Sequence, residues 1–275
     1  MKIIPIRPKG NPNGFMPMLM DNPDIISLSQ AINQGVATIS ERGSASTENV
    51  HWLRINNKSE KSIFISSGEM IGGGRQDRMV MKDTILVPNN RDQYIPVMCV
   101  EEGRWADKEK KFTYNNFANS HLRKVLDVGK NQVLIWNEID NQLQSADIKN
   151  NTMAYLSRNL DKKYVDIDED YFKFFKQKFK NSDSTIVGFV CVSGNKIIGS
   201  DIFANRSFFY SQLEPLLRGY IDETIFYGGK GMVDNDKVHD YMDKILSDER
   251  SQEEFVNKNG KIFRQGGQVI HITTY

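Results

Sequence analysis

The pattern of apolar and polar residues indicates strands in the segment from residue 50 to residue 102. Its short runs are rich in β-branched and aromatic residues and are separated by turn formers: VHWLRI, KSIFISSG, RMVMKDTILVP and QYIPVMCVEE. This spacing is typical of an antiparallel sheet or sandwich and not of βαβ units. The run YIPVMCV is almost continuously apolar, which predicts a central strand with Pro96 at its start or at a bulge.

Helical spacing appears on both sides of this β-rich segment. The stretch from Ser27 begins with a capping residue and predicts a short helix that Gly35 ends. Apolar residues recur at helical spacing in 131–148, 168–181, 207–229 and 235–248. The proline-rich residues 1–24 predict an extended segment with little regular structure, and the polar residues 106–131 predict a long loop.

The last third of the chain adds further strands. Residues 184–203 contain two apolar runs joined by Ser-Gly-Asn-Lys, which predicts a β hairpin, and residues 260–275 contain two strands around Gly-Gly. We therefore predict an α+β fold in which an antiparallel, β-rich N-terminal half of about 1–120 packs with a C-terminal half, about 121–275, of helices and a β hairpin. No flexible linker separates the halves, so we expect one compact domain over 1–275.

The composition narrows the function classes. The 275 residues carry 36 basic and 35 acidic side chains, and this net charge of +1 gives no broad basic field for nucleic acid. Cys99 and Cys191 lie in apolar runs, which predicts two buried, reduced thiols. The first residues carry proline and charge where a signal peptide needs an apolar stretch, and no apolar run approaches the ~20 residues that a membrane span needs. We expect a soluble cytoplasmic protein with no membrane or nucleic-acid partner, and the oligomeric state stays open.

The segment Gly72-Gly73-Gly74-Arg75-Gln76-Asp77-Arg78 joins two predicted strands. Glycines let backbone amides approach a ligand and form anion-binding nests. Arg75 and Arg78 can offer bidentate donors to phosphate or carboxylate, and Gln76 can recognise a base or a ribose hydroxyl. The loop is neither a P-loop nor a dinucleotide motif, because no helix start follows it. The alternative is a wide hairpin connection whose arginines pair with Glu69 and Asp77.

A second polar cluster, CVEEGRW, follows the apolar strand directly. Glu101 and Glu102 can supply an acid and a base, Arg104 can hold an anion, and Trp105 offers a stacking face. The alternative is that Glu101 pairs with Arg75 or Arg78 inside the sheet while Trp105 caps the core.

Both clusters belong to a longer pattern. The segments GEMIGGGRQDRMVMKDTILVP and IPVMCVEEGRW resemble the family of the ARG and rhodanese-phosphatase-superfamily-associated protein domain, where ARG stands for ADP-ribosylglycohydrolase. The later VGFVCVSGNKIIGSDIF and QVIHIT also resemble the C-terminal half of that family. The resemblance implies only a link to proteins that process ADP-ribose or phosphoesters. Its pattern falls on Gly68, Glu69, Gly72, Gly73, Gln76, Arg78, Pro88, Pro96, Val97, Cys99, Val100, Glu101, Gly103, Arg104 and Trp105, and Gly74 is an extra glycine.

Other motifs carry no chemistry. Asp166–Gln177 begins like a calcium loop but has Tyr171 where that loop needs glycine. The four histidines show no metal-ligand spacing, and no Gly-x-Ser-x-Gly motif is present. We predict no metal site and no cofactor. Asp201 either ends its strand with a turn or faces the Arg75/Arg78 loop.

Three functions remain. The first is a binding module for a small anionic ligand, such as a nucleotide or an ADP-ribose derivative. Its ligand-binding residues would be Gly72, Gly73, Arg75, Gln76, Arg78, Arg104 and Trp105. The second is a hydrolase acting on such a ligand, with Glu69 or Glu101 as the catalytic general base. The third is a structural or interaction protein in which these residues form a buried ion-pair network.

Overall fold

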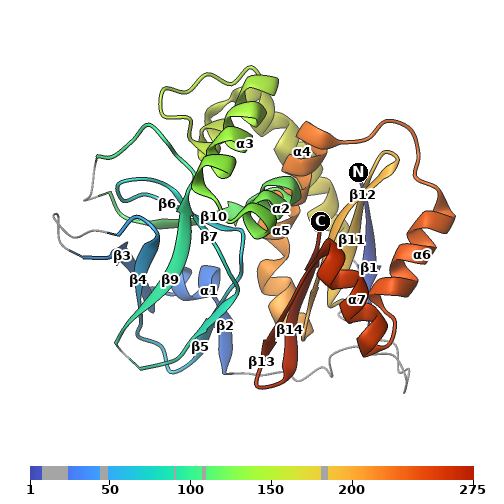
Figure 1. The fold of residues 1–275 in the computed structure, drawn as a ribbon, viewed down its shortest axis with the longest axis horizontal. Helices are drawn as coiled ribbons and strands as arrows, with labels where there is room; N and C mark the ends of the chain where they lie inside the picture. Colours follow the sequence, from blue (N-terminus) through green and yellow to red (C-terminus); the bar gives the residue numbers. More distant parts are fainter. Residues whose placement is uncertain (8–23, 44–48, 90, 107–109, 181–184) are drawn as a thin grey trace. The chain divides into compact units, whose positions relative to one another are not determined.

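The computed structural model describes residues 1–7, 24–43, 49–89, 91–106, 110–180 and 185–275. It divides the chain into two compact units (Figure 1). The central unit is Asn22–Lys173, and the terminal unit combines Met1–Asp21 with Phe174–Tyr275. Helices and mostly antiparallel sheets confirm the α+β class, but the division does not follow the boundary near residue 120. One core shared by the whole chain stays a prediction.

The central unit is built on a six-stranded antiparallel sheet. Its order is β10 (Thr113–Phe117), β6 (Glu69–Gly72), β7 (Arg78–Val80), β9 (Asp92–Cys99), β4 (Trp52–Asn57) and β3 (Ala37–Glu41). A second sheet has the order β2 (Ile25–Ser27), β5 (Ser62–Ile65) and β8 (Thr84–Leu86), and β2 pairs with β5 in parallel. The predicted strands between residues 50 and 102 are therefore confirmed.

The two faces of the six-stranded sheet have different cores. Met70, Met79 and Met98 are cross-strand neighbours and pack with the apolar residues of α2 (Ser120–Gly129) and α3 (Gln132–Ser145). Because side chains alternate along a strand, their neighbours Ile71 and Val97 point to the opposite face. That face packs with α1 (Leu28–Asn33) and the small sheet. Arg78 pairs with Ile71 and Cys99 in the register and so belongs to this second face.

Local signals explain the confirmed helices. Ser27 caps α1 through the Gln30 amide, and the Gln30 side chain accepts from the Ser27 amide, which completes a capping box. At α3, the side chain of Asn131 caps the helix by accepting hydrogen bonds from the Val133 and Leu134 amides. A short 3-10 helix, η1 (Tyr155–Leu160), follows α3.

Two predictions for the central unit are wrong. Residues 106–131 are not one long loop, since β10 and α2 lie within them. Pro96 lies inside β9 and not at its start or at a bulge. The register explains why it fits there. Pro96 pairs with Trp52 of β4, and its carbonyl oxygen accepts from the Met81 amide just beyond the end of β7. Its missing N–H therefore falls where the ladder with β7 ends.

The terminal unit contains a five-stranded antiparallel sheet with helices on both faces. The strand order is β1 (Lys2–Ile6), β11 (Gly188–Ser193), β12 (Lys196–Phe203), β14 (Gln268–Thr274) and β13 (Gly260–Gln265). Phe189 and Phe203 pack on one face against Phe209 of α5 (Arg206–Tyr227). Val190 and Ile202 point the other way, toward α6 (Asn235–Ile245) and α7 (Glu249–Asn259) (Figure 1).

Most predictions for the terminal unit are confirmed: the hairpin of β11 and β12, the helices α5 and α6, and the closing strands. The helix predicted at 168–181 is α4 (Lys162–Lys180), which begins earlier and runs across the boundary between the units. The helix α7 and the strand β1 were not predicted, and the rest of the extended segment, residues 8–23, lies outside the described residues. Cys99 and Cys191 are buried and free, as expected. No helix in the described residues is long and apolar enough to cross a membrane.

Candidate functional site

The glycine-rich loop is the turn between β6 and β7, and its shape requires glycine. Gly73 and Gly74 have φ angles of +120° and +53°. A Cβ on Gly73 would lie 2.4 Å from the carbonyl oxygen of Lys111, and one on Gly74 would lie 2.2 Å from Cζ of Phe112. The consecutive glycines therefore allow the turn to pack directly against Lys111 and Phe112.

The backbone amides of this turn already donate within the chain. The Gly73 amide donates to Oδ1 of Asp77 at 2.8 Å, and the Gly74 amide donates to the carbonyl oxygen of Lys110 at 2.8 Å. The next amide, of Arg75, donates to Oε1 of Glu41 at 2.9 Å. These three amides donate to three separate acceptors of the chain itself, so they do not converge on one anion as the nest expected from the sequence would require.

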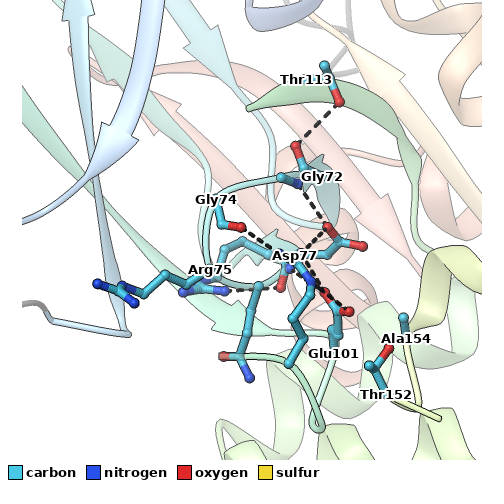
Figure 2. A network of polar contacts seen from close by, with 12 residues as sticks. Gly72, Gly74, Arg75, Asp77, Glu101, Thr113, Thr152 and Ala154 are labelled. Carbon is cyan, nitrogen blue, oxygen red and sulfur yellow. Dashed lines mark hydrogen bonds and ion pairs between the residues drawn. The ribbon is translucent and has the colours of Figure 1, made fainter. Parts of the chain in front are cut away.

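Arg104 joins the two predicted clusters. Its Nε donates to both carboxylate oxygens of Glu101 at 2.9 Å, and its Nη1 donates to the carbonyl oxygen of Gly74 at 2.6 Å. Its Nη2 lies 3.3 Å from Oδ1 of Asp77, and the Asp77 amide donates to Oε2 of Glu101 (Figure 2). We call Arg104, Glu101 and Asp77 the Arg104 network. It ties the glycine turn to the segment after β9.

The two carboxyl groups of the Arg104 network differ in acidity. Burial raises the pKa of Asp77, and the nearby Glu101 carboxylate adds to this effect. Burial also acts to raise the pKa of Glu101, but hydrogen bonds from Arg104, Thr152 and the Asp77 amide outweigh it and hold that pKa below its ordinary value. Glu101 is therefore the firmly ionised partner of Arg104.

Arg78 is completely buried on the face of the sheet that packs with α1. Its Nη2 lies 3.8 Å from Oε2 of Glu41, and its Nη1 donates to the carbonyl oxygen of Asp77 at 3.4 Å. Within the described part of the chain, its Nε and Nη2 make no hydrogen bond. A guanidinium placed in this way balances the buried Glu41 carboxylate and is not open to a ligand.

Glu69 has no exposed surface and belongs to a separate group of contacts. Its Oε2 accepts from the Ser66 amide at 2.9 Å, and its Oε1 accepts from the hydroxyl of Tyr114 at 3.2 Å. Burial and the Glu69 carboxylate raise the pKa of Tyr114.

The outer surface of the site is formed by Arg75 and Trp105. Arg75 is partly exposed, and its side chain points away from Asp77 and Glu101 (Figure 2). Its Cζ lies 5.5 Å from the centroid of the Trp105 ring, and Trp105 is 48% exposed. Trp105 therefore does not cap the core. Gln76 is buried and donates to the carbonyl oxygen of Glu102 at 3.3 Å, which places it beneath this surface.

The structure thus brings together Gly72, Gly73, Arg75, Gln76, Arg78, Glu101, Arg104 and Trp105 around one turn. It also adds residues that the sequence analysis did not single out for this site: Glu41 from β3 and the segment 110–112 before β10. No local motif marks these residues, because their role arises only when β3 and β10 approach the turn.

Asp201 of the terminal unit does not end its strand. It lies within β12 and accepts hydrogen bonds on both carboxylate oxygens, with Tyr220 Oη at 2.7 Å and His271 Nε2 at 2.8 Å. No group of three or more His, Cys, Asp or Glu side chains in the described ranges is arranged to hold a metal ion.

Comparison with known proteins identifies a family but no relative of known activity. The family model of the ARG and Rhodanese-Phosphatase-superfamily-associated Protein domain matches residues 1–274. Neither a curated protein nor a solved structure matches this chain.

Proposed function

The chain belongs to the ARG and Rhodanese-Phosphatase-superfamily-associated Protein domain family, and we propose that its Arg75–Trp105 surface binds a small anionic ligand, a nucleotide or an ADP-ribose derivative. The observation that carries this proposal is the partly exposed Arg75, whose guanidinium carbon lies 5.5 Å from the centroid of the half-exposed Trp105 ring. A phosphate recognises the first group and an aromatic base recognises the second.

The charge around this surface favours an anion. The Lys110 carbonyl holds the Gly74 amide, and the Lys110 charge acts on Asp77 to lower its pKa, so a second cation lies close to the turn. Lys110 and Lys111 are both exposed. Glu102 is the exposed acidic residue of the neighbouring segment. Arg75 beside the ring and Lys110 near the turn can attract a phosphorylated ligand.

The Arg104 network serves this surface from below. The Arg104 guanidinium already contacts the Glu101 and Asp77 carboxyl groups and the Gly74 carbonyl oxygen. We therefore assign it no ligand contact: its role in binding is to hold the turn and the Trp105 segment in one geometry. A prearranged surface loses less conformational entropy when the ligand binds. Gly72, Gly73, Gln76, Arg78 and Arg104 thus act as supports, and the ligand contacts fall to Arg75 and Trp105.

The hydrolase alternative has less support. A general base works best with a pKa near the operating pH, but the pKa of Glu101 is lowered and Arg104 holds both of its oxygens. Glu69 has no exposed surface and already accepts two hydrogen bonds. We therefore propose binding without a catalytic role for these two carboxylates.

A titration with ADP-ribose, ADP, AMP and inorganic phosphate tests the proposal. We expect ADP-ribose or an adenine nucleotide to raise the melting temperature and to bind in calorimetry. Loss of one stacked ring is worth ~1–3 kcal/mol, so Trp105→Ala should weaken binding about tenfold or more. Arg75→Ala should weaken it similarly, and Trp105→Phe should retain much of the affinity.

Arg54→Ala is the matched control. Arg54 is an exposed arginine on β4 of the same unit, where it pairs with Asp92, and its loss removes the same charge. It should leave the affinity unchanged. The proposal fails if none of the four compounds binds, or if Arg54→Ala weakens binding as much as Arg75→Ala does.

We also propose a cytoplasmic location. Both cysteines are free and buried in strands of different units, which suits a reducing compartment. Fractionation of cells that express the full chain tests this proposal directly.

A further inference from the structure

A second candidate site lies in the terminal unit, beside the edge strand β1. Here an open cavity of about 400 Å³ is lined by residues of β1, by the last turns of α4 and by Ile186. This volume is within the range of small-molecule sites in proteins. It shares no residue with the Arg75–Trp105 surface, and its argument is independent of the function proposed above.

The sequence periods of the two elements explain the cavity. Ile3 and Pro5 alternate along β1 and pair with Cys191 and Phe189, so both point to the face of the sheet that carries the aromatic core. On α4, Phe175 and Phe179 are one turn apart and buried toward the same face. Among the described strands, β1 is the outermost of its sheet, so none of them fills the space at this edge.

The rim of the cavity is cationic. Lys178 lines it, and none of the lining residues in the described part of the chain is acidic. Lys2 also lines the cavity, but it precedes Ile3 on β1, so its side chain points to the opposite face of the sheet. Lys178 is one turn from Phe174, and its Nζ lies 4.4 Å from the centroid of that ring. Among the residues that the structure describes, neither lysine forms an ion pair, whereas the neighbouring Lys176 pairs with Glu214 at 2.6 Å.

Phe174 adds an accessible aromatic wall. It is 52% exposed and packs edge-to-face against Phe175, with the ring centroids 5.1 Å apart. An apolar interior with a lysine at its mouth is complementary to a molecule that has an apolar body and one anionic end. We infer that this cavity binds small amphipathic carboxylates, with the hydrocarbon part among Ile3, Pro5 and Phe179 and the carboxylate near Lys178.

Octanoate and its neutral counterpart 1-octanol test this inference on the full chain. We expect octanoate to bind saturably in calorimetry below its micellar range and to bind more tightly than 1-octanol. Lys178→Gln should weaken octanoate binding about fivefold, as for the loss of one partly exposed charge pair, and should leave 1-octanol binding unchanged. Lys176→Gln, on the same helix, should change neither.

A second variant tests the position of the hydrocarbon. Ile3 lies on the edge strand and is only partly buried, so Ile3→Trp fills the cavity without replacing a fully buried residue. It should abolish the binding of both octanoate and 1-octanol while the melting temperature without ligand changes little. The inference is overturned if octanoate does not bind, if Ile3→Trp binds it normally, or if Lys176→Gln weakens binding as much as Lys178→Gln.

Discussion

Asp201 and His271 form a hydrogen-bonded contact inside the terminal unit, with Oδ1 and Nε2 2.8 Å apart and no exposed surface on either side chain. They lie on the adjacent strands β12 and β14, and the hydroxyl of Tyr220 donates to the other carboxylate oxygen at 2.7 Å. The His271 ring also stacks on Phe203, with centroids 4.5 Å apart. This contact is therefore a polar link inside an aromatic core, and its partners satisfy one another.

Removal of the carboxylate should strongly destabilise the terminal unit. Asp201→Ala leaves His271 and Tyr220 buried without their acceptor, and breaking one side of a buried pair costs ~3–5 kcal/mol. Urea denaturation measures this loss. Asp240→Ala is the control, because Asp240 pairs with Lys244 on the surface and should cost less than ~1 kcal/mol. Equal losses in the two variants would contradict the buried link.

Gly74→Ala should destabilise the central unit by more than backbone strain alone. Its φ is +53°, and the new Cβ would lie 2.6 Å from Oε1 of Glu41 as well as against Phe112. Gly35→Ala is the matched control, since Gly35 has a φ of +71° but a Cβ added there would meet no atom within 4 Å. We expect ~1 kcal/mol for Gly35→Ala and at least ~2 kcal/mol for Gly74→Ala in chemical denaturation. Similar losses would show that the packing of the turn contributes little.

Most elements with a clear apolar period were predicted from the sequence, whereas a cap alone did not reveal a helix: α2 and α7 carry the caps Asn119 and Asp248 and were both missed. The helix α3 has both, because Asn131 caps it and Ile135, Ile139 and Leu143 share one buried face. The strand β10 has neither, since its residues TYNNF are polar and only Phe117 is fully buried at this sheet edge. The helix α7 buries only Gln252 and Val256, so its pattern is also weak.

The candidate site shows the same limit in another form. Its glycines and arginines stand out in the sequence because turns and charge pairs need those residue types. The sequence does not show which groups these residues contact. Glu41 and the Arg75 amide, for example, are 34 positions apart and form their hydrogen bond only when β3 and β7 join one sheet. Sequence reasoning could therefore identify the segments of the site but not whether a ligand or the chain itself satisfies their charges.

Tyr114→Phe should destabilise the central unit and change its alkaline behaviour. The hydroxyl of Tyr114 donates to the buried Glu69, and its loss leaves that carboxylate short of a partner at a cost of ~1–3 kcal/mol. The folded-state pKa of Tyr114 is raised, so the stability it contributes is fully present below the unfolded pKa of about 10 and is lost as pH rises above that value.

The measurement is denaturation at pH 8 and at successive steps above pH 10. The wild type should lose stability more steeply than Tyr114→Phe over the alkaline range. Tyr94→Phe serves as the control, because Tyr94 is 43% exposed, and it should follow the wild type. The same alkaline slope in Tyr114→Phe and wild type would contradict the raised pKa.

The Arg104 network predicts opposite acid responses for its two carboxyl groups. Glu101 has a lowered pKa, so it contributes stability above its unfolded pKa of about 4.3, and this is lost as pH falls through the folded value. Asp77 has a raised pKa, so its contribution is full below its unfolded pKa of about 3.9 and is lost as pH rises through the folded value.

Between about pH 3 and 5, the unfolding free energy of Glu101→Gln should therefore rise less steeply with pH than that of the wild type, whereas that of Asp77→Asn should rise more steeply. The slopes, and not the absolute stabilities, carry this test, because either substitution also removes hydrogen bonds at every pH. If the slope changed in the same direction in both variants, the pKa values of Glu101 and Asp77 would not be shifted in opposite directions, and the prediction would be wrong.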